Sequence, residues 1–205
     1  YQAAIESGQE NVGRWVRLFY AYVCRELLEG RCRYNAKKAN RAIRFIETFC
    51  HHCEGRSDPL KLELWQKALV AVIFGVTDPT GARQFREVFL VVARKNGKTL
   101  LAAAIIACGV FIDGEYGAKI YCVAPKLDQA DLVYSMFWQT VKYEPDLRAM
   151  IRPRKSDYYM ESSNSSVKKI AFNSKKSDGY NPHMTVCDEV ASWPGEKGLR
   201  QYEVM

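Results

Sequence analysis

Hydrophobic residues recur at every third or fourth position through the first third of the chain, which is the spacing of amphipathic helices. The pattern predicts a helix over residues 11–29 and a second helix that Asn35 caps and Gly55 ends. A third helix is predicted over residues 60–74. Because no catalytic pattern accompanies these helices, we assign residues 1–58 to an N-terminal helical region.

After residue 81 the pattern changes to short, continuous apolar runs that alternate with helical periodicity. Residues 88–92 and 119–124 are runs of the kind that parallel sheets bury on both faces, and a helical pattern follows each run. Two such strand–helix units favour a right-handed βαβ crossover. Residues 59–205 are therefore predicted to form an α/β domain with a mainly parallel central sheet flanked by helices.

Two further strand signals follow in the last third of the chain. Residues 158–160 and 167–172 flank a Ser/Asn-rich segment and are predicted to pair as an antiparallel hairpin. Residues 183–187 form an apolar run that leads directly into two carboxylates, and we expect this run to be the last strand.

The composition is that of a globular protein, with 48% hydrophobic and 26% charged residues in a chain of 205. No apolar run reaches the roughly 18 residues that a membrane-spanning helix needs, so we expect no membrane partner. The formal net charge of +7 is compatible with a nucleic-acid partner. Because the chain begins with Tyr1, we expect it to be a fragment of a longer protein.

One cluster has the residue types of a zinc site, namely Cys50, His51, His52 and Cys53. Four consecutive residues cannot supply all four tetrahedral ligands, and no second Cys-x-x-Cys follows. We therefore expect packing at a helix end, with zinc binding as the alternative.

The segment Asn96-Gly97-Lys98-Thr99 stands between the predicted strand at residues 88–92 and a helix. This is the setting of a phosphate-binding loop, in which backbone N–H groups at a helix N-terminus face the anion. Lys98 would reach the β- and γ-phosphates, and the Thr99 hydroxyl would hold Mg²⁺. The general pattern GxxxxGK[ST] asks for glycine where this chain has Val92. An ordinary strand–helix turn with an exposed lysine is the alternative.

Asp188 and Glu189 follow the predicted strand at residues 183–187. Ligands of open α/β sheets bind at the carboxyl ends of strands, so these side chains would face the same crevice as the loop. Asp188 would orient the water shell of Mg²⁺, and Glu189 would polarise a water for attack on the γ-phosphate of ATP. Loop and acids together predict a P-loop NTPase of the ASCE type, with an added catalytic glutamate. Adjacent acids in a surface turn are the alternative.

From about Leu62 to Trp193 the chain resembles the ATPase domain of the large terminase subunit of tailed bacteriophages, the motor that packages DNA into procapsids. Terminases commonly lack the first glycine of the loop, so Val92 agrees with this family. The resemblance rests on blocks in a specific order and spacing: Leu64-Trp65-Gln66-Lys67, Phe85-Arg86-Glu87-Val88, Val92-Ala93-Arg94-Lys95-Asn96-Gly97-Lys98-Thr99, Asp128-Gln129-Ala130 and Asp178-Gly179-Tyr180-Asn181-Pro182-His183.

The resemblance implies roles that spacing does not reveal. Arg94 matches the arginine that terminases carry inside the loop as a γ-phosphate sensor or in-cis finger, so it would join Lys98 and Glu189 as a catalytic residue. Gln66 matches a glutamine associated with adenine recognition. Surface positions are the alternative for both residues. The residues expected to bind ATP are Gln66, Arg94, Lys95, Asn96, Gly97, Lys98 and Thr99, and those expected at Mg²⁺ are Thr99 and Asp188.

The resemblance also implies partners: double-stranded DNA, the small terminase subunit, the portal protein, and further copies of the chain in a ring. The expected location is the cytoplasm of the infected or prophage-carrying bacterial host. Terminases continue with a coupling strand, which lies between the loop strand and the Asp-Glu strand, and with a nuclease domain. Only sixteen residues follow Glu189, so we expect that neighbouring strand to be missing.

Two other functions stay open from the sequence. The first is another ASCE-type DNA translocase or helicase-like ATPase on the same architecture. The second is a non-catalytic adaptor such as the small terminase subunit, against which the combination of Lys98 and Glu189 argues.

A basic segment lies between Arg152 and Lys176, where seven basic residues accompany two acidic ones. A motor that moves along any DNA sequence needs phosphate contacts and no base readout. We therefore predict that this segment contacts the DNA backbone, with a solvated hairpin face as the alternative.

Overall fold

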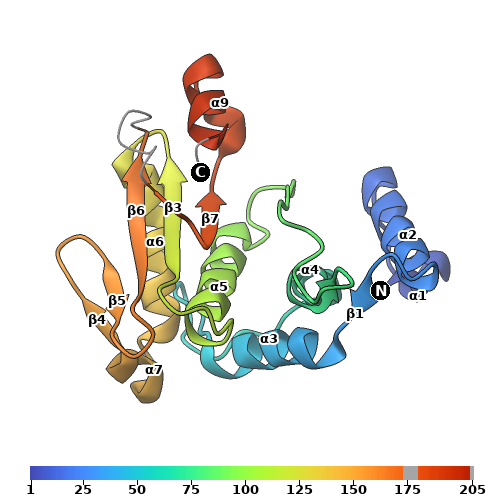
Figure 1. The fold of residues 1–205 in the computed structure, drawn as a ribbon, viewed down its shortest axis with the longest axis horizontal. Coiled ribbons are helices and arrows are strands. Elements are labelled where there is room, and N and C mark those ends of the chain that lie inside the picture. Colours follow the sequence, from blue (N-terminus) through green and yellow to red (C-terminus); the bar gives the residue numbers. More distant parts are fainter. Residues whose placement is uncertain (173–179, 204–205) are drawn as a thin grey trace. The chain divides into compact units, whose positions relative to one another are not determined.

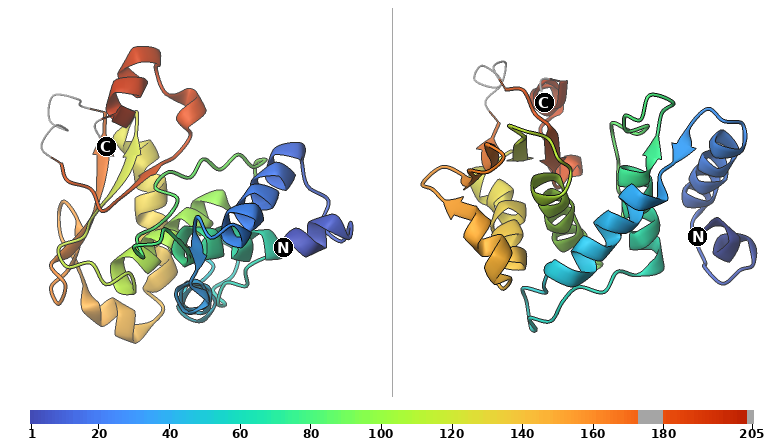
Figure 2. Two further views of the ribbon diagram at one scale, coloured as in Figure 1. Left: turned by 45° about the vertical axis from the view of Figure 1, so that its right-hand side comes forward. Right: turned by 60° about the horizontal axis from the view of Figure 1, so that its bottom comes forward.

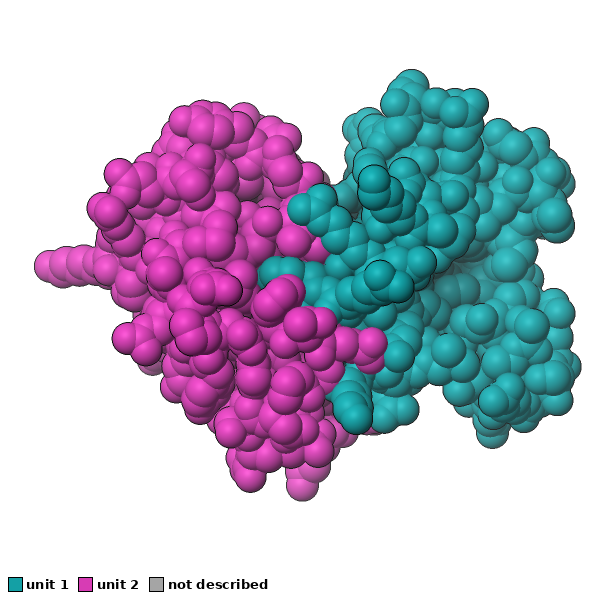
Figure 3. Space-filling view, turned by 90° about the horizontal axis from the view of Figure 1, so that it is seen from below, with its two compact units in different colours: residues 1–45, 61–91 teal, residues 46–60, 92–205 magenta. Residues whose placement is uncertain are grey.

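The computed structural model describes residues 1–172 and 180–203. Its contacts divide the chain into two compact units, residues 1–45 with 61–91 and residues 46–60 with 92–205 (Figure 3). The boundary between an N-terminal helical region (residues 1–58) and an ATPase domain (residues 59–205) stays a prediction. Among the described helices, none is long and apolar enough to cross a membrane.

The first unit is mainly helical. Its elements are α1 (Gln2–Glu6), α2 (Arg14–Leu28), β1 (Arg33–Tyr34), the first part of α3 (Ala36–Phe49), α4 (Leu64–Gly75) and β2 (Val76–Thr77) (Figure 1). A core of Val23, Cys32, Val72 and Val76 holds α2 against α4 and the β1–β2 pair.

The three predicted N-terminal helices are confirmed, with shifted ends. Asn35 caps α3 as expected, because its side-chain oxygen accepts a hydrogen bond from the Lys38 N–H at 3.0 Å. The helix ends at Phe49, earlier than the predicted stop at Gly55. α4 starts at Leu64 because Glu63 and Gln66 form a capping box there.

The second unit contains a five-stranded sheet in the order β4-β5-β6-β3-β7. The strands are β3 (Lys119–Ala124), β4 (Ile151–Pro153), β5 (Tyr158–Met160), β6 (Ser165–Ala171) and β7 (Met184–Cys187). β3 pairs in parallel with β6 and β7, whereas β5 pairs antiparallel with both β6 and β4. The prediction of a mainly parallel sheet is therefore wrong: the sheet is mixed, because β4 extends the expected hairpin by an antiparallel strand.

Helices α5 (Lys98–Phe111) and α6 (Leu127–Val141) pack against each other and against one face of this sheet (Figures 1 and 2). Gly109 allows α5 to approach closely, because a Cβ atom there would lie 3.1 Å from both Ile120 of β3 and Met184 of β7. Among its described residues, this unit also contains the end of α3, the helices α7 (Pro145–Met150) and α9 (Gly195–Glu203), and the 3₁₀ turn η1 (Val190–Ser192).

Residues 88–92 do not form the predicted strand. The segment has no regular secondary structure and pairs with none of the described strands, and Phe89 and Val91 are each 79% exposed. A continuous apolar run becomes a buried strand only where a neighbouring strand accepts its backbone hydrogen bonds. The βαβ crossover predicted from this run is also not formed. The chain between the parallel neighbours β3 and β6 runs through α6, α7, β4 and β5.

The Cys50–Cys53 segment packs the end of α3 against α6, as expected for a helix end. The His51 N–H donates to the Thr140 carbonyl at 2.9 Å, and the Thr140 hydroxyl donates to the His51 carbonyl at 2.7 Å. The His51 ring lies 2.6 Å from Glu144. Cys50 is fully buried, which raises the pKa of its thiol. No group of His, Cys, Asp and Glu within the described ranges is arranged to hold a metal.

The His51–Glu144 pair makes stability depend on pH. Burial lowers the pKa of His51, but hydrogen bonds to Glu144 and to the Ser57 carbonyl raise it overall above 6.5. A raised folded-state pKa stabilises the protein below the unfolded-state pKa, and this contribution is lost as pH rises through the folded-state value. We expect His51→Gln to remove a pH-dependent contribution of about 1 kcal/mol from the free energy of unfolding, measured by urea unfolding between pH 5 and 8.5.

His52 provides a control with the opposite sign. Burial, together with the neighbouring Arg56, lowers the pKa of His52. His52→Gln should therefore make stability fall more steeply with rising pH. Parallel stability curves for wild type and His51→Gln would contradict the assignment.

Candidate active site

The loop before α5 contains two residues with a left-handed backbone just before the helix begins. Gly97 is the N-cap residue, with a left-handed φ of 67°, and Lys95 is also left-handed, with φ 65°. The Asn96 side-chain amide donates to the carbonyls of Ala93 and Arg94 at 3.1 and 3.2 Å, which holds the loop closed from within. No side chain caps α5. The first N–H groups of a long apolar helix are thus available to an anion.

The second part of the site follows β7, where the chain turns sharply. Glu189 has a left-handed φ of 50°, and its N–H donates to Asp188 Oδ1 at 2.8 Å. The Ser192 hydroxyl donates to the Glu189 carbonyl at 2.8 Å. The Trp193 indole N–H donates to the Asp188 carbonyl at 3.0 Å, and the Trp193 ring packs edge-on against Phe172. These contacts hold the two carboxylates at the end of the strand.

The structure brings Lys98 to both carboxylates across 91 residues of sequence. Its Nζ lies 3.4 Å from Asp188 Oδ1 and donates a hydrogen bond to Glu189 Oε1. This hydrogen bond lowers the pKa of Glu189, to which Arg94 adds a smaller electrostatic contribution, and it raises the pKa of Lys98. Both groups are therefore charged at neutral pH. Glu189 is 55% exposed and Asp188 only 16%.

The other residues predicted to bind ATP or Mg²⁺ differ in exposure and in hydrogen-bond partners. Arg94 and Lys95 are exposed in the loop, and Thr99 follows Lys98 in the first turn of α5. Gln66 belongs to the first unit, where its side-chain oxygen accepts the Glu63 N–H at 2.9 Å. Gln66 thus has a structural role as a capping residue, and its part in adenine recognition stays a prediction.

Sequence reasoning missed Ser192, Trp193 and Phe172. Trp193 stands close after the Asp-Glu pair, and an indole near a catalytic turn is a usable signal because its N–H needs a partner when buried. No sequence pattern marked Phe172 as part of the site. Its contact with Trp193 joins the end of β6 to the turn after β7, and such a long-range contact leaves no local pattern.

Residues 64–203 match the family model for the ATPase domain of the terminase large subunit. The chain belongs to this family. The large terminase subunit of Enterobacteria phage HK97 is 27% identical over 163 residues, which cover 77% of this chain and 31% of that protein. The crystal structure of the HK97 bacteriophage large terminase matches with a TM-score of 0.66 at 26% identity, over 77% of this chain and 32% of that chain.

These matches confirm the resemblance to large terminase subunits. The matched range contains the loop before α5 and the Asp188–Glu189 pair, whereas residues 1–63 lie before it. The chain spans about a third of the length of the HK97 protein. The family is that of the large, ATPase-bearing subunit, so the small-subunit adaptor is not supported.

Proposed function

We propose that this terminase ATPase domain is a P-loop NTPase of the ASCE type that binds ATP with Mg²⁺ and hydrolyses it to drive double-stranded DNA into a procapsid. One observation carries the proposal: the Lys98 ammonium lies beside Asp188 and Glu189 at the uncapped N-terminus of α5. A cation, a helix N-terminus and two carboxylates in one place match the needs of phosphoryl transfer.

The loop is suited to a triphosphate. The Asn96 side-chain amide donates hydrogen bonds to carbonyl groups inside the loop. The backbone N–H groups of Lys95, Gly97 and Thr99 are the donors that we propose to face phosphate oxygens. Lys98 would exchange its carboxylate partners for the β- and γ-phosphates. That exchange frees Glu189 from its hydrogen bond with the ammonium.

The carboxylates then have different tasks. Asp188 and Thr99 offer the oxygen ligands that Mg²⁺ prefers, and bound Mg²⁺ neutralises charge on the phosphates. The low exposure of Asp188 suits a fixed position, whereas the exposure of Glu189 suits contact with a water molecule. Glu189 would orient that water and accept its proton, and Arg94 would act on the γ-phosphate.

The proposal for the whole protein includes its partners. They are double-stranded DNA, the small terminase subunit, the portal protein and further copies in a ring, all in the cytoplasm of the bacterial host. The proposal of these partners rests on family membership. The chain itself spans only about a third of the HK97 relative.

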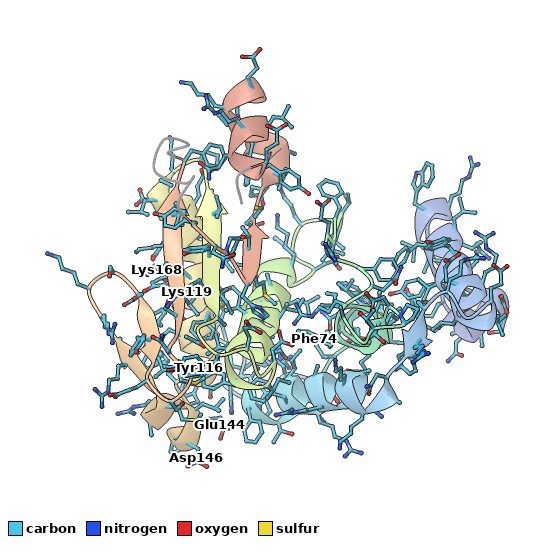
Figure 4. All side chains as sticks on the ribbon, viewed as in Figure 1. Phe74, Tyr116, Lys119, Glu144, Asp146 and Lys168 are labelled. Carbon is cyan, nitrogen blue, oxygen red and sulfur yellow. The ribbon has the colours of Figure 1, made fainter. Side chains whose placement is uncertain are left out.

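The predicted DNA contact of the basic segment can be assigned to individual residues where the structure describes β6. Lys168 and Lys169 are neighbours on β6 but point to opposite faces of the sheet. Lys169 turns toward α6, where its Nζ pairs with Asp131 at 2.5 Å. Lys168, labelled in Figure 4, belongs to the other face. Its Nζ lies 3.9 Å from Asp157 Oδ2. Arg154 stacks on Tyr159 near this second face.

We propose that Lys168 and Arg154 contact DNA phosphates and that Lys169 does not. The prediction for Lys175 and Lys176 lies outside the described residues.

The role of Lys98 can be tested by binding. Lys98→Ala should weaken Mg-ATP binding about 10- to 100-fold, because a charge-assisted hydrogen bond contributes about 1.5–3 kcal/mol. Calorimetry measures the affinity. The control is Lys119→Ala, at the other end of the sheet, which should retain wild-type affinity. Equal affinities in wild type and Lys98→Ala would reject the phosphate-loop assignment.

The role of Glu189 can be tested by turnover. Glu189→Gln keeps size and hydrogen bonding but removes the charge that accepts a proton. ATP binding should persist while kcat falls about 10²-fold or more. A phosphate-release assay measures this rate, and a kcat within a few-fold of wild type would remove Glu189 from the mechanism.

The DNA surface can be tested with matched neighbours. Lys168→Met should weaken duplex binding for all sequences and lower the slope of log affinity against log salt by about 0.9, as expected for one lost phosphate contact. Lys169→Met removes the same charge from the opposite face and should leave the slope unchanged. Fluorescence anisotropy across a salt series measures both. Identical slopes in the two variants would mean that DNA follows another path.

A further inference from the structure

A hydrogen-bond contact joins the end of α5 to the start of β7, remote from the candidate active site. His183 Nε2 lies 2.6 Å from Asp113 Oδ2, and the two side chains are only 22% and 19% exposed. Asp113 follows the last turn of α5, where its N–H donates to the Cys108 carbonyl at 3.1 Å. His183 directly precedes β7, and its N–H donates to the Lys119 carbonyl of β3 at 2.9 Å.

The two elements are therefore linked at both ends. At the site end, Lys98 of α5 contacts the carboxylates that follow β7. At the far end, Asp113 contacts His183. Between them, Gly109 leaves room for the Met184 side chain, so the helix and the strand are in direct contact.

Contacts with α5 add to the sheet pairing of β7. The strand has four residues, and among the described strands it pairs with β3. A displacement of about 1 Å at a catalytic group can cost on the order of 10²-fold in rate.

We infer that the His183–Asp113 pair is a positioning device that holds β7 in register with α5, so that Glu189 keeps its place when Lys98 turns to the nucleotide. The inference rests on the proposed ATPase function. Nucleotide binding replaces the contact at the site end, because Lys98 exchanges carboxylates for phosphates. The far-end pair includes none of Lys98, Asp188 and Glu189, so it persists through that exchange.

The first test separates rate from binding. In the full native chain, His183→Ala should lower kcat about 10-fold and leave the ATP affinity within twofold of wild type. His183→Gln, whose amide can still donate to Asp113, should recover most of the rate. The matched control is Asp131→Ala, which breaks the ion pair between α6 and β6 and should leave kcat unchanged.

The second test needs no catalysis. Trp193 donates to the Asp188 carbonyl, so its indole reports on the end of β7. With fluorotryptophan labelling, the ¹⁹F resonance of Trp193 should shift or broaden in nucleotide-free His183→Ala. The resonance of Trp138 on α6 should not change. If His183→Ala does not fold, Asp113→Asn and His183→Gln provide graded weakening of the same pair.

The outcomes are distinct. A wild-type protein without ATP turnover would overturn the proposed function, while the Trp193 resonance would still test the pair. A His183→Ala protein with wild-type kcat and an unchanged Trp193 resonance would overturn the inference. Equal losses of kcat and affinity would also overturn it, because they indicate general damage and not a displaced Glu189.

Discussion

The contact between Lys98 and the carboxylates of Asp188 and Glu189 is the interaction on which the candidate site depends. It joins the first residue of α5 to the turn after β7 and brings together groups that are 91 residues apart in sequence. Apolar packing makes this possible: most residues of α5 are buried, so the helix position is determined by the sheet beneath it. The polar groups at the helix start and the strand end cannot be buried, and they meet at the edge of the core.

Charge balance explains why this contact can be exchanged. The ammonium group and the helix N-terminus attract anions, and without a phosphate the nearby carboxylates satisfy that demand. A triphosphate offers more negative charge to the same groups, so in the proposed mechanism its binding would release Glu189 at the point where a water-orienting base is required. The same charged groups thus form the tertiary contact in the free protein and take part in the proposed chemistry.

The sheet around this site is asymmetric. β3 is held by parallel neighbours on both sides, whereas β7, which leads to Asp188 and Glu189, has a single paired neighbour among the described strands. The close packing at Gly109 and the hydrogen-bond contact of Asp113 with His183 provide further connections to α5. The placement of Glu189 therefore depends on residues at the opposite end of both elements.

Local patterns in the sequence determined the helices, the strand at residues 119–124, the hairpin and the chemical types of the site residues, because periodicity, caps and turn residues act within a few positions. Tertiary structure decided what depends on a neighbour. Residues 88–92 have the composition of a buried strand, but they stay exposed where no described strand pairs with them. The opposite environments of Lys168 and Lys169 and the pairing of His183 with Asp113 also depend on long-range contacts. A sequence pattern records that a residue is suited to burial or pairing, but only the folded chain determines which partner it meets.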